Sequence, residues 1–282
     1  MRLGSLLIAS CAAVALLPAA VLAADYDPPI FVEEAPEWVP VEIGSGWYLR
    51  GDVGYAASTR PSKAFEYRTF DIGTGDYGAA IFDTSRLGEN FSFGGGVGYN
   101  INDWLRVDAT LDVGKIGFEG TTSSLDPCPG APLGTTCRSE DSSSAHAWSG
   151  LLNAYADIGT VAGFTPYVGA GAGFTYLRWN GLDSNYFCVD DVATCGGLGL
   201  VDSESRGKAR DWRFTWALMA GVAYDVSDNV KVDVGYRYRK ISGGDTFDWD
   251  QASLAGGATG KQGRDSGYSQ HQVRVGLRYN LW

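Results

Sequence analysis

The stretch "HQVRVGLRYNLW" (residues 271–282) alternates strictly between two kinds of side chain. Odd positions from Val273 to Leu281 are apolar, whereas even positions from Gln272 to Asn280 are polar or glycine. A period of two places the two sets on opposite faces of a β-strand. In a soluble sandwich the apolar face points into a core, but in a transmembrane barrel it points out to lipid. The choice between these environments decides the fold.

Seven further segments alternate in the same way, namely 47–57, 91–101, 104–113, 152–158, 166–176, 212–226 and 230–239. Their connections alternate in length, with tight turns at 100–103, 161–165 and 226–229 and long loops at 58–89, 120–145, 180–209 and 241–267. This sorting of short turns and long loops is typical of bacterial outer-membrane barrels. The sequence therefore predicts an all-β fold, an eight-stranded antiparallel up-and-down transmembrane β-barrel.

One β-turn-β unit occurs twice. "GVGYNINDWLRVD" (96–108) aligns without gaps on "GVAYDVSDNVKVD" (221–233). The tyrosine, the turn and the basic–apolar–Asp triplet keep the same spacing in both copies. Such a repeat suits an up-and-down barrel.

The N-terminus has the three regions of a cleaved signal peptide. Arg2 precedes an apolar region from Leu6 to Leu17, and Val21–Ala23 is a small-residue cleavage signal. We therefore expect a signal peptide at 1–23, an acidic, Pro-rich periplasmic linker at 24–45 and the barrel at 46–282. Cleavage after Ala23 or Ala24 stays open. The pattern at 8–11 is that of a lipoprotein box, but it would split the apolar region, which argues against lipidation.

Charge and composition exclude several classes of function. The 33 acidic and 22 basic residues give a net charge of −11, which argues against nucleic acid as a partner and against a polybasic membrane-surface binder. The 39 glycines and an aromatic content of 13% suit antiparallel β-structure.

The apolar faces of the eight segments contain no charged residue. Along these faces the first charges are Lys115, Arg178 and Lys240, each at the long-loop end of its strand. A charge facing lipid costs about 2–4 kcal/mol at the bilayer midplane and far less near an interface. This placement favours the membrane barrel, and near the outer leaflet the three cations could meet lipopolysaccharide phosphates.

The opposite faces carry charges of both signs. An eight-stranded barrel has room for little beyond its own side chains, so we expect these charges to form ion pairs in the lumen. Arg274 and Arg278 are expected to point toward Asp52 or Asp233. The lumen candidates are Arg50, Asp52, Arg106, Asp108, Asp112, Asp157, Arg213, Asp225, Lys231, Asp233, Arg237, Arg239, Arg274 and Arg278.

Aromatic residues gather near both ends of the predicted strands. Two such bands are favoured at membrane interfaces and predict two girdles. The short-turn side has Trp47, Tyr99, Trp104, Tyr224, Tyr279 and Trp282, and the long-loop side has Trp148, Trp179, Trp212, Trp216, Tyr236 and Tyr238.

Four cysteines follow the predicted signal peptide as two close pairs, Cys128 with Cys137 and Cys188 with Cys195. In an exported protein, two local disulfides in the long loops are the expected arrangement. A four-cysteine zinc site is the alternative, although neither pair has CxxC spacing.

The ordered motifs "AADY", "GWYLRGDVGY", "DWLRVDATLDVG", "TPYVGAGAGFTY", "VKVDVGYRYRK" and "VRVGLRY" cover essentially all of the expected mature chain. They resemble the opacity-protein-like small outer-membrane β-barrel family of alphaproteobacteria, which is related to the OmpA transmembrane domain and often labelled porin-like. The resemblance implies the outer membrane of a Gram-negative bacterium and insertion by the outer-membrane assembly machinery. That machinery recognises a terminal aromatic, yet Trp282 lies one residue out of phase with the lipid-facing positions.

Four functions can be considered for such a barrel. A structural and surface role in the envelope is the first, and a narrow porin with weak anion preference is the second. Enzymatic activity is not expected, because His146 and Ser149 are three apart on a strand and face opposite sides. Haem or host-ligand binding by the loops is the fourth, with Tyr186, Tyr268 and His271 as candidate ligands, although their spacing demands no cofactor. The expected partners are outer-membrane lipid, lipopolysaccharide and small-molecule or host ligands at the loops.

Overall fold

A computed structural model describes residues 43–57, 65–88, 90–196 and 199–281. The predicted signal peptide, residues 24–42 of the predicted linker and Trp282 lie outside these ranges. The first strand begins at Ile43, slightly before the barrel boundary expected at residue 46. Within the described ranges, no helix has the length and hydropathy needed to cross a membrane.

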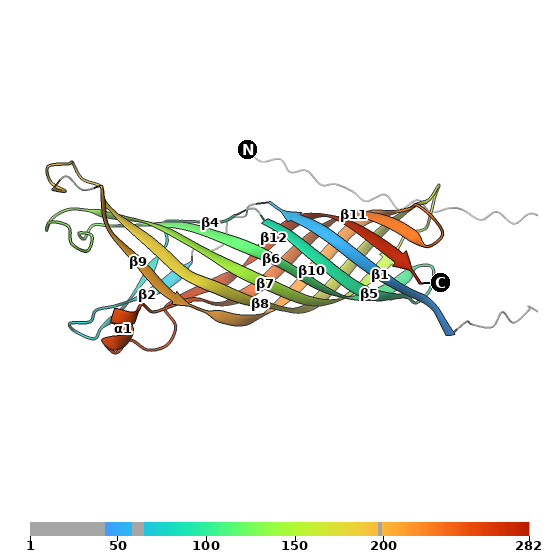
Figure 1. The fold of residues 1–282 in the computed structure, drawn as a ribbon, viewed down its shortest axis with the longest axis horizontal. Helices are drawn as coiled ribbons and strands as arrows, with labels where there is room; N and C mark the ends of the chain where they lie inside the picture. The colour runs from blue at the N-terminus through green and yellow to red at the C-terminus, as the bar shows by residue number, and fades with distance from the viewer. Residues whose placement is uncertain (1–42, 58–64, 89, 197–198, 282) are drawn as a thin grey trace, which may run out of the picture. The chain divides into compact units, whose positions relative to one another are not determined.

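Eight antiparallel strands close into a ring (Figure 1). Each pairs with the next along the chain, and the last pairs with the first. The predicted eight-stranded up-and-down barrel is therefore confirmed. Its strands are β1 (Ile43–Ala56), β5 (Asn90–Asn100), β6 (Leu105–Ser124), β7 (Cys137–Asp157), β8 (Phe164–Cys188), β10 (Arg210–Asp225), β11 (Val230–Asp248) and β12 (Gly263–Asn280).

Three tight turns lie at the end of the barrel where β12 finishes, as Figure 1 shows. Backbone hydrogen bonds join two of these turns to the end of a neighbouring strand: the Asp157 amide of β7 donates to the Trp104 carbonyl, and the Asn280 amide of β12 donates to the Asn229 carbonyl. The three tight turns were predicted at the correct places in the sequence. A turn of a few residues fixes how the two strands that it joins are paired.

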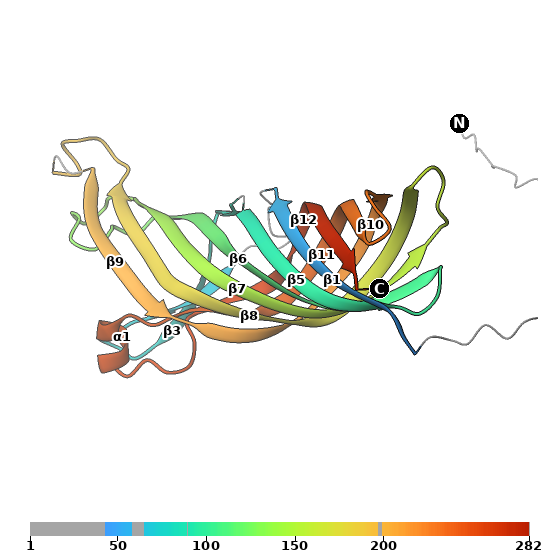
Figure 2. The same cartoon turned by 45° about the vertical axis from the view of Figure 1, so that its right-hand side comes forward.

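The other end corrects the sequence interpretation, because most of the predicted long loops are strand. The ring strands continue well past their predicted ends, and β9 (Leu200–Lys208) pairs with β8 and β11. We call this part the extension. It comprises β2 (Glu66–Phe70), β3 (Tyr77–Ile81), β4 (Thr84–Leu87), β9, α1 (Gln251–Ala255) and the parts of β6, β7, β8, β11 and β12 beyond Lys115, His146, Arg178, Lys240 and His271. Figure 2 shows β9, β3 and α1 at the end opposite the tight turns.

The two faces of the strands that continue into the extension exchange character where it begins. Toward the tight turns, β7 points Leu152 outward at 72% exposure and buries Asn153 in the lumen at 6%. Toward the extension, the same strand buries Ala145 completely and exposes Ser142 and Glu140. One strand thus has the pattern of a membrane barrel in one half and of a soluble β-protein in the other.

Two glycines with positive φ change the direction of side chains inside the extension, and the first, Gly181, lies at the β-bulge between β7 and β8. Gly181 in β8 and Gly267 in β12 have φ values of 104° and 90°, which favour glycine. A Cβ would lie 2.4 Å from the Arg206 carbonyl oxygen at Gly181 and 2.6 Å from the Ile241 carbonyl oxygen at Gly267. Beyond each of these glycines the buried positions move by one residue, so period-two alternation fails there.

An apolar core fills the extension across the end of the lumen, and we call it the plug. It joins strands that are far apart in sequence, and Phe118 packs against Phe65 and Phe82 at ring-centroid distances of 4.7 and 5.3 Å. The plug consists of Phe65, Phe82, Leu87, Ile116, Phe118, Ala145, Ala147, Leu177, Trp179, Leu182, Ile241, Phe247 and Tyr268. A hydrophobic core of this size stabilises the extension by removing apolar surface from water.

Candidate functional site

Between the plug and the tight turns, buried ion pairs fill the lumen. The sequence placed these charges on one face, and the structure brings most of them together as pairs from different strands. The N–O distances are 2.7 Å for Arg50–Asp52, Arg50–Asp108 and Arg237–Asp112, 2.9 Å for Arg274–Asp112, 3.1 Å for Arg106–Asp157, 3.2 Å for Arg278–Asp233 and 3.3 Å for Arg274–Asp52. The Lys231–Asp225 pair, also at 2.7 Å, is partly exposed near the tight turns. Pairing is needed because an isolated buried charge is very costly.

Asp112 lies at the centre of this network. Its two carboxylate oxygens accept from Arg237 of β11 and Arg274 of β12, and Arg237 also donates to Gln272 at 2.8 Å. In the ring, β6 and β11 stand opposite each other, so this ion pair spans the lumen. It ties the two walls of the barrel together.

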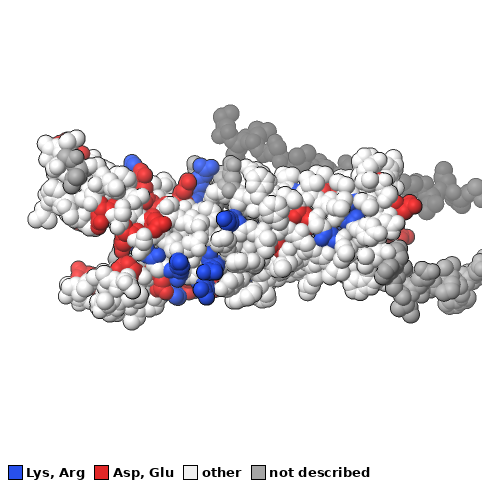
Figure 3. Space-filling view, viewed as in Figure 1, with Lys and Arg blue, Asp and Glu red and all other residues white. Residues whose placement is uncertain are grey.

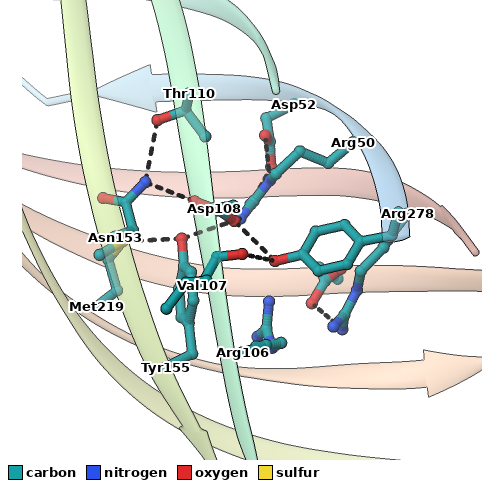
Figure 4. A network of polar contacts seen from close by, with 12 residues as sticks. Arg50, Asp52, Arg106, Val107, Asp108, Thr110, Asn153, Tyr155, Met219 and Arg278 are labelled. Atoms are coloured by element: carbon teal, nitrogen blue, oxygen red, sulfur yellow. Dashed lines mark hydrogen bonds and ion pairs between the residues drawn. The ribbon is translucent and has the colours of Figure 1, made fainter. Parts of the chain in front are cut away.

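A second group of contacts surrounds Asp108, as Figure 4 shows. This carboxylate accepts from Arg50 at 2.7 Å and from Asn153 at 2.7 Å, and the Tyr48 hydroxyl donates to it at 3.1 Å. Every oxygen of this carboxylate therefore has a donor from another strand. A saturated network of this kind favours one arrangement of the strands over others.

The predicted lumen candidates did not include two inward-facing tyrosines, Tyr155 and Tyr167. The Arg106 guanidinium lies 4.1 Å from the Tyr155 ring centroid and 4.7 Å from that of Tyr167, which are cation–π distances. Strand alternation could have identified both, because each lies on the polar face of its strand.

Two predicted lumen cations have partners that the sequence did not indicate. Arg239 makes no ion pair with a described residue and donates instead to Gln270 and Ser149. Arg213 pairs with Asp265 in the extension at 2.6 Å, a carboxylate that was not a lumen candidate. Both cations lie near Tyr268 of the plug.

One cavity in the lumen is very small. An internal cavity lined by Arg50, Tyr155, Tyr167 and Met219 has a volume of about 10 Å³. That is room for about one water molecule. Beyond it, the plug fills the barrel.

The structure contains two disulfides in the extension, Cys128–Cys137 and Cys188–Cys195. Cys137 and Cys188 are direct cross-strand partners on β7 and β8, so the two disulfides lie at one level. The Thr136 amide donates to the Asp190 carboxylate at 2.5 Å and joins the two cysteine loops. Because both pairs are bonded, these cysteines offer no thiolates for the alternative zinc site.

Most of the predicted girdle aromatics face outward. At the tight-turn end, Trp47 packs against Tyr99 at 5.3 Å, and Trp104 is 71% exposed. Tyr224 and Tyr279 are exposed in the same half of the barrel, and Trp216, Tyr236 and Tyr238 lie on the outward faces of β10 and β11. Trp179 corrects the prediction: it is 1% exposed and belongs to the plug, because its position in β8 has inward parity.

The candidate haem ligands do not form one site. Tyr268 is completely buried in the plug, whereas His271, three residues along β12, faces outward and shares a 2.5 Å hydrogen bond with Tyr236. Tyr186 donates to Glu204 within the extension, where burial raises the pKa of its hydroxyl. His146 and Ser149 likewise face opposite sides, with His146 stacked on Trp148 and Ser149 buried in the lumen.

The barrel geometry agrees with what the chain is similar to. An uncharacterized protein of Brucella melitensis is 35% identical over 272 residues, covering 89% of this chain and 90% of that protein. The outer membrane protein PagN of Salmonella typhimurium is 27% identical over 148 residues, covering 52% of this chain and 56% of PagN. Among solved structures, Neisserial surface protein A is 18% identical, with a TM-score of 0.38, and the match covers 84% of this chain and 98% of that one.

The family described as outer membrane protein beta-barrel domain matches residues 9–280, nearly the whole chain. This match agrees with the closed ring of strands, the outward apolar faces and the localisation predicted from the resemblance. The chain belongs to the outer membrane protein beta-barrel domain family and is a protein of the Gram-negative outer membrane.

Proposed function

We propose that this protein is a non-conducting surface barrel, which spans the outer membrane and holds a rigid β-sheet extension outside it. The observation that carries the proposal is the plug, which closes the lumen with side chains such as Phe118 and Trp179. Buried ion pairs make the membrane half stiff, and two disulfides hold the end of the extension. Such a protein contributes to envelope structure and displays its extension to the surroundings.

The narrow porin is the weaker alternative. An ion crossing the lumen would have to pass both the ion-pair network at Asp112 and the plug. Moving these groups aside would leave buried charges without partners, which is strongly unfavourable. A weak anion preference would require an open channel, and the proposed closed lumen does not provide one.

Surface display is supported by the exterior of the extension. Its outward positions on β7 and β8 include Arg138, Glu140, Asp183 and Asn185, which suit water rather than lipid. We further propose that host or small-molecule ligands contact this end, and that the assembly machinery inserts the barrel. No catalytic role is proposed, since His146 and Ser149 face opposite sides of β7.

Planar-bilayer recording tests the proposal. The purified, refolded protein is expected to give no steady channels, while an open general porin in the same bilayer gives discrete steps. Heat-modifiable gel mobility must first demonstrate that the sample is folded. Steady single-channel steps from the folded protein would contradict the closed lumen and restore the porin alternative.

A further inference from the structure

A row of basic side chains crosses four neighbouring strands on the outside of the barrel. Lys115 of β6 is the cross-strand partner of His146 of β7, His146 is the partner of Arg178 of β8, and Arg178 is the partner of Arg210 of β10. We call these four residues the basic row. Adjacent strands lie about 4.8 Å apart, so the row presents closely spaced cations on one continuous surface. The register brings together residues that span almost one hundred positions of sequence.

The basic row differs from the cations inside the barrel. Lys115, Arg178 and Arg210 are exposed, and none of their side chains forms an ion pair or hydrogen bond with another described residue. In contrast, Arg237 and Arg274 in the lumen each pair with Asp112. Figure 3 shows Lys and Arg gathered in a band across the barrel, with Asp and Glu further toward the end that carries β9. The basic row thus has charge available for an anionic partner.

An aromatic surface lies directly beside the basic row on the side of the tight turns. Two residues along each strand, Trp148, Tyr176 and Trp212 are cross-strand partners. Their rings form a continuous series, with centroids 5.8 Å apart for Trp148–Tyr176 and 5.0 Å apart for Tyr176–Trp212. Aromatic side chains of this kind favour the boundary between acyl chains and polar headgroups.

A groove on the outward face of the barrel lies between the basic row and the apolar surface beside it. It has a volume of about 520 Å³ and is lined by Phe91, Phe93, Val113 and Trp148, with Lys115 and His146 also in its lining. Its lining therefore includes both apolar and basic side chains. This combination fits a ligand that has an anionic headgroup and a hydrocarbon chain.

We propose that the basic row is a binding site for the phosphate groups of lipid A, the anchor of lipopolysaccharide in the outer leaflet. The cations pair with the phosphates, while an acyl chain lies in the groove against Phe93 and Val113. A lipid is favoured over a phosphorylated macromolecule because the aromatic surface continues into the lipid-facing part of the barrel. The inference extends the proposed envelope role to a defined lipid, but it does not depend on whether the lumen conducts.

The test compares two triple variants with the same loss of charge. The row variant is Lys115→Gln/Arg178→Gln/Arg210→Gln. The matched control is Arg138→Gln/Lys261→Gln/Arg264→Gln, which removes three exposed cations from the extension. Each protein is placed in phosphatidylcholine nanodiscs, and fluorescent lipopolysaccharide with bisphosphorylated lipid A is titrated. Because each cation near an anionic surface contributes about 1 kcal/mol, we expect binding at least about tenfold weaker for the row variant and unchanged for the control.

Two ligand controls separate a lipid site from a general phosphate site. Dephosphorylated lipopolysaccharide is expected to bind the wild type as weakly as the intact lipid binds the row variant. Inorganic phosphate at millimolar concentration is expected to leave lipopolysaccharide bound. Displacement by inorganic phosphate would overturn the lipid assignment, and equal binding by the row variant and the wild type would overturn the site.

Folding of each variant is checked by heat-modifiable gel mobility. If the row variant does not fold, Arg178→Gln/Arg210→Gln replaces it, with Arg138→Gln/Arg264→Gln as its control. The charge-preserving variant Lys115→Arg/Arg178→Lys/Arg210→Lys is expected to bind like the wild type. Loss of lipid binding in that variant would mean that side-chain shape, and not charge, determines binding, and it would contradict the proposal. This outcome does not depend on the conductance measurement.

Discussion

Asp112 on β6 and Arg237 on β11 form an ion pair across the full width of the lumen, with 2.7 Å between Oδ2 and Nη1. Both side chains are 2% exposed. Arg274 of β12 shares the same carboxylate at 2.9 Å. Three strands of the barrel thus depend on one aspartate, and strands that are not neighbours in the ring hold their relative positions through it.

Asp112→Asn is expected to destabilise the barrel strongly, because the buried Arg237 guanidinium loses its counter-charge and Arg274 keeps only its longer pair with Asp52. Breaking a buried pair in this way costs about 3–5 kcal/mol. The measurement is urea unfolding in lipid vesicles, followed by tryptophan fluorescence. Asp225→Asn is the matched control, since its pair with Lys231 is more exposed and should contribute less than about 1 kcal/mol. Similar losses of unfolding free energy for both variants would contradict the central role of Asp112 in the lumen.

Removing the first disulfide should affect the end of the extension and spare the barrel. The double variant Cys128→Ser/Cys137→Ser releases a loop with a sequence separation of 9, for which loop-closure entropy gives about 2–3 kcal/mol. We expect faster proteolysis within 125–136 and unchanged heat-modifiable mobility. Leu133→Ser, in the same loop but 94% exposed, should change neither. Loss of the folded gel band in the double variant would contradict a local role.

The plug should stabilise the extension as a core stabilises a soluble domain. Phe118→Ala removes a ring that packs on Phe65 and Phe82, and such truncations cost about 3–5 kcal/mol. The expected result is faster amide hydrogen exchange in β2, β4 and the outer part of β6. Leu125→Ala, at 89% exposure, is the control and should lie within about 0.5 kcal/mol of the wild type. Unchanged exchange in Phe118→Ala would mean that the plug does not hold these strands.

Protection of α1 should depend on pH through Asp250. Burial opposes the charge of this carboxylate, but hydrogen bonds from the Ser253 amide and hydroxyl, at 2.9 and 2.5 Å, outweigh it and lower the pKa of Asp250. A lowered folded pKa contributes stability above the unfolded value of about 3.9, and that stability is lost as the pH falls through the folded value. Exchange protection of the Ser253 amide, corrected for intrinsic rate, should fall in this acidic range. In Asp250→Asn the protection should not vary with pH, and a parallel fall there would exclude Asp250 as the cause.

Much of the membrane half could be predicted from the sequence, because alternation there is strict and the turns are short. The parity of Arg274 and Arg278 placed both in the lumen, and the structure places them beside Asp52 and Asp233. Which cation meets which carboxylate across the lumen could not be predicted. Contacts such as Arg237–Asp112 depend on how far each strand is displaced along its neighbour, and local sequence does not specify that displacement.

The extension was missed for two physical reasons. Its faces are inverted, so apolar positions such as Ile116 follow charged ones such as Asp112 on the same inward face of β6. In addition, the positive-φ glycines Gly181 and Gly267 shift the alternation of buried positions by one residue. Trp179 lies before its bulge, and its inward parity was readable from Thr175 on the same strand.

The central claim is that each long strand reverses its faces where the extension begins, and cysteine accessibility along β7 tests it most directly. Single substitutions Leu152→Cys, Ala145→Cys and Ser142→Cys are treated on intact cells with a membrane-impermeant maleimide. The account predicts labelling at position 142 only, because residue 152 faces lipid and residue 145 lies in the plug. Labelling of 145 with protection of 142 would contradict the reversal, and labelling of 152 would contradict the position of the membrane.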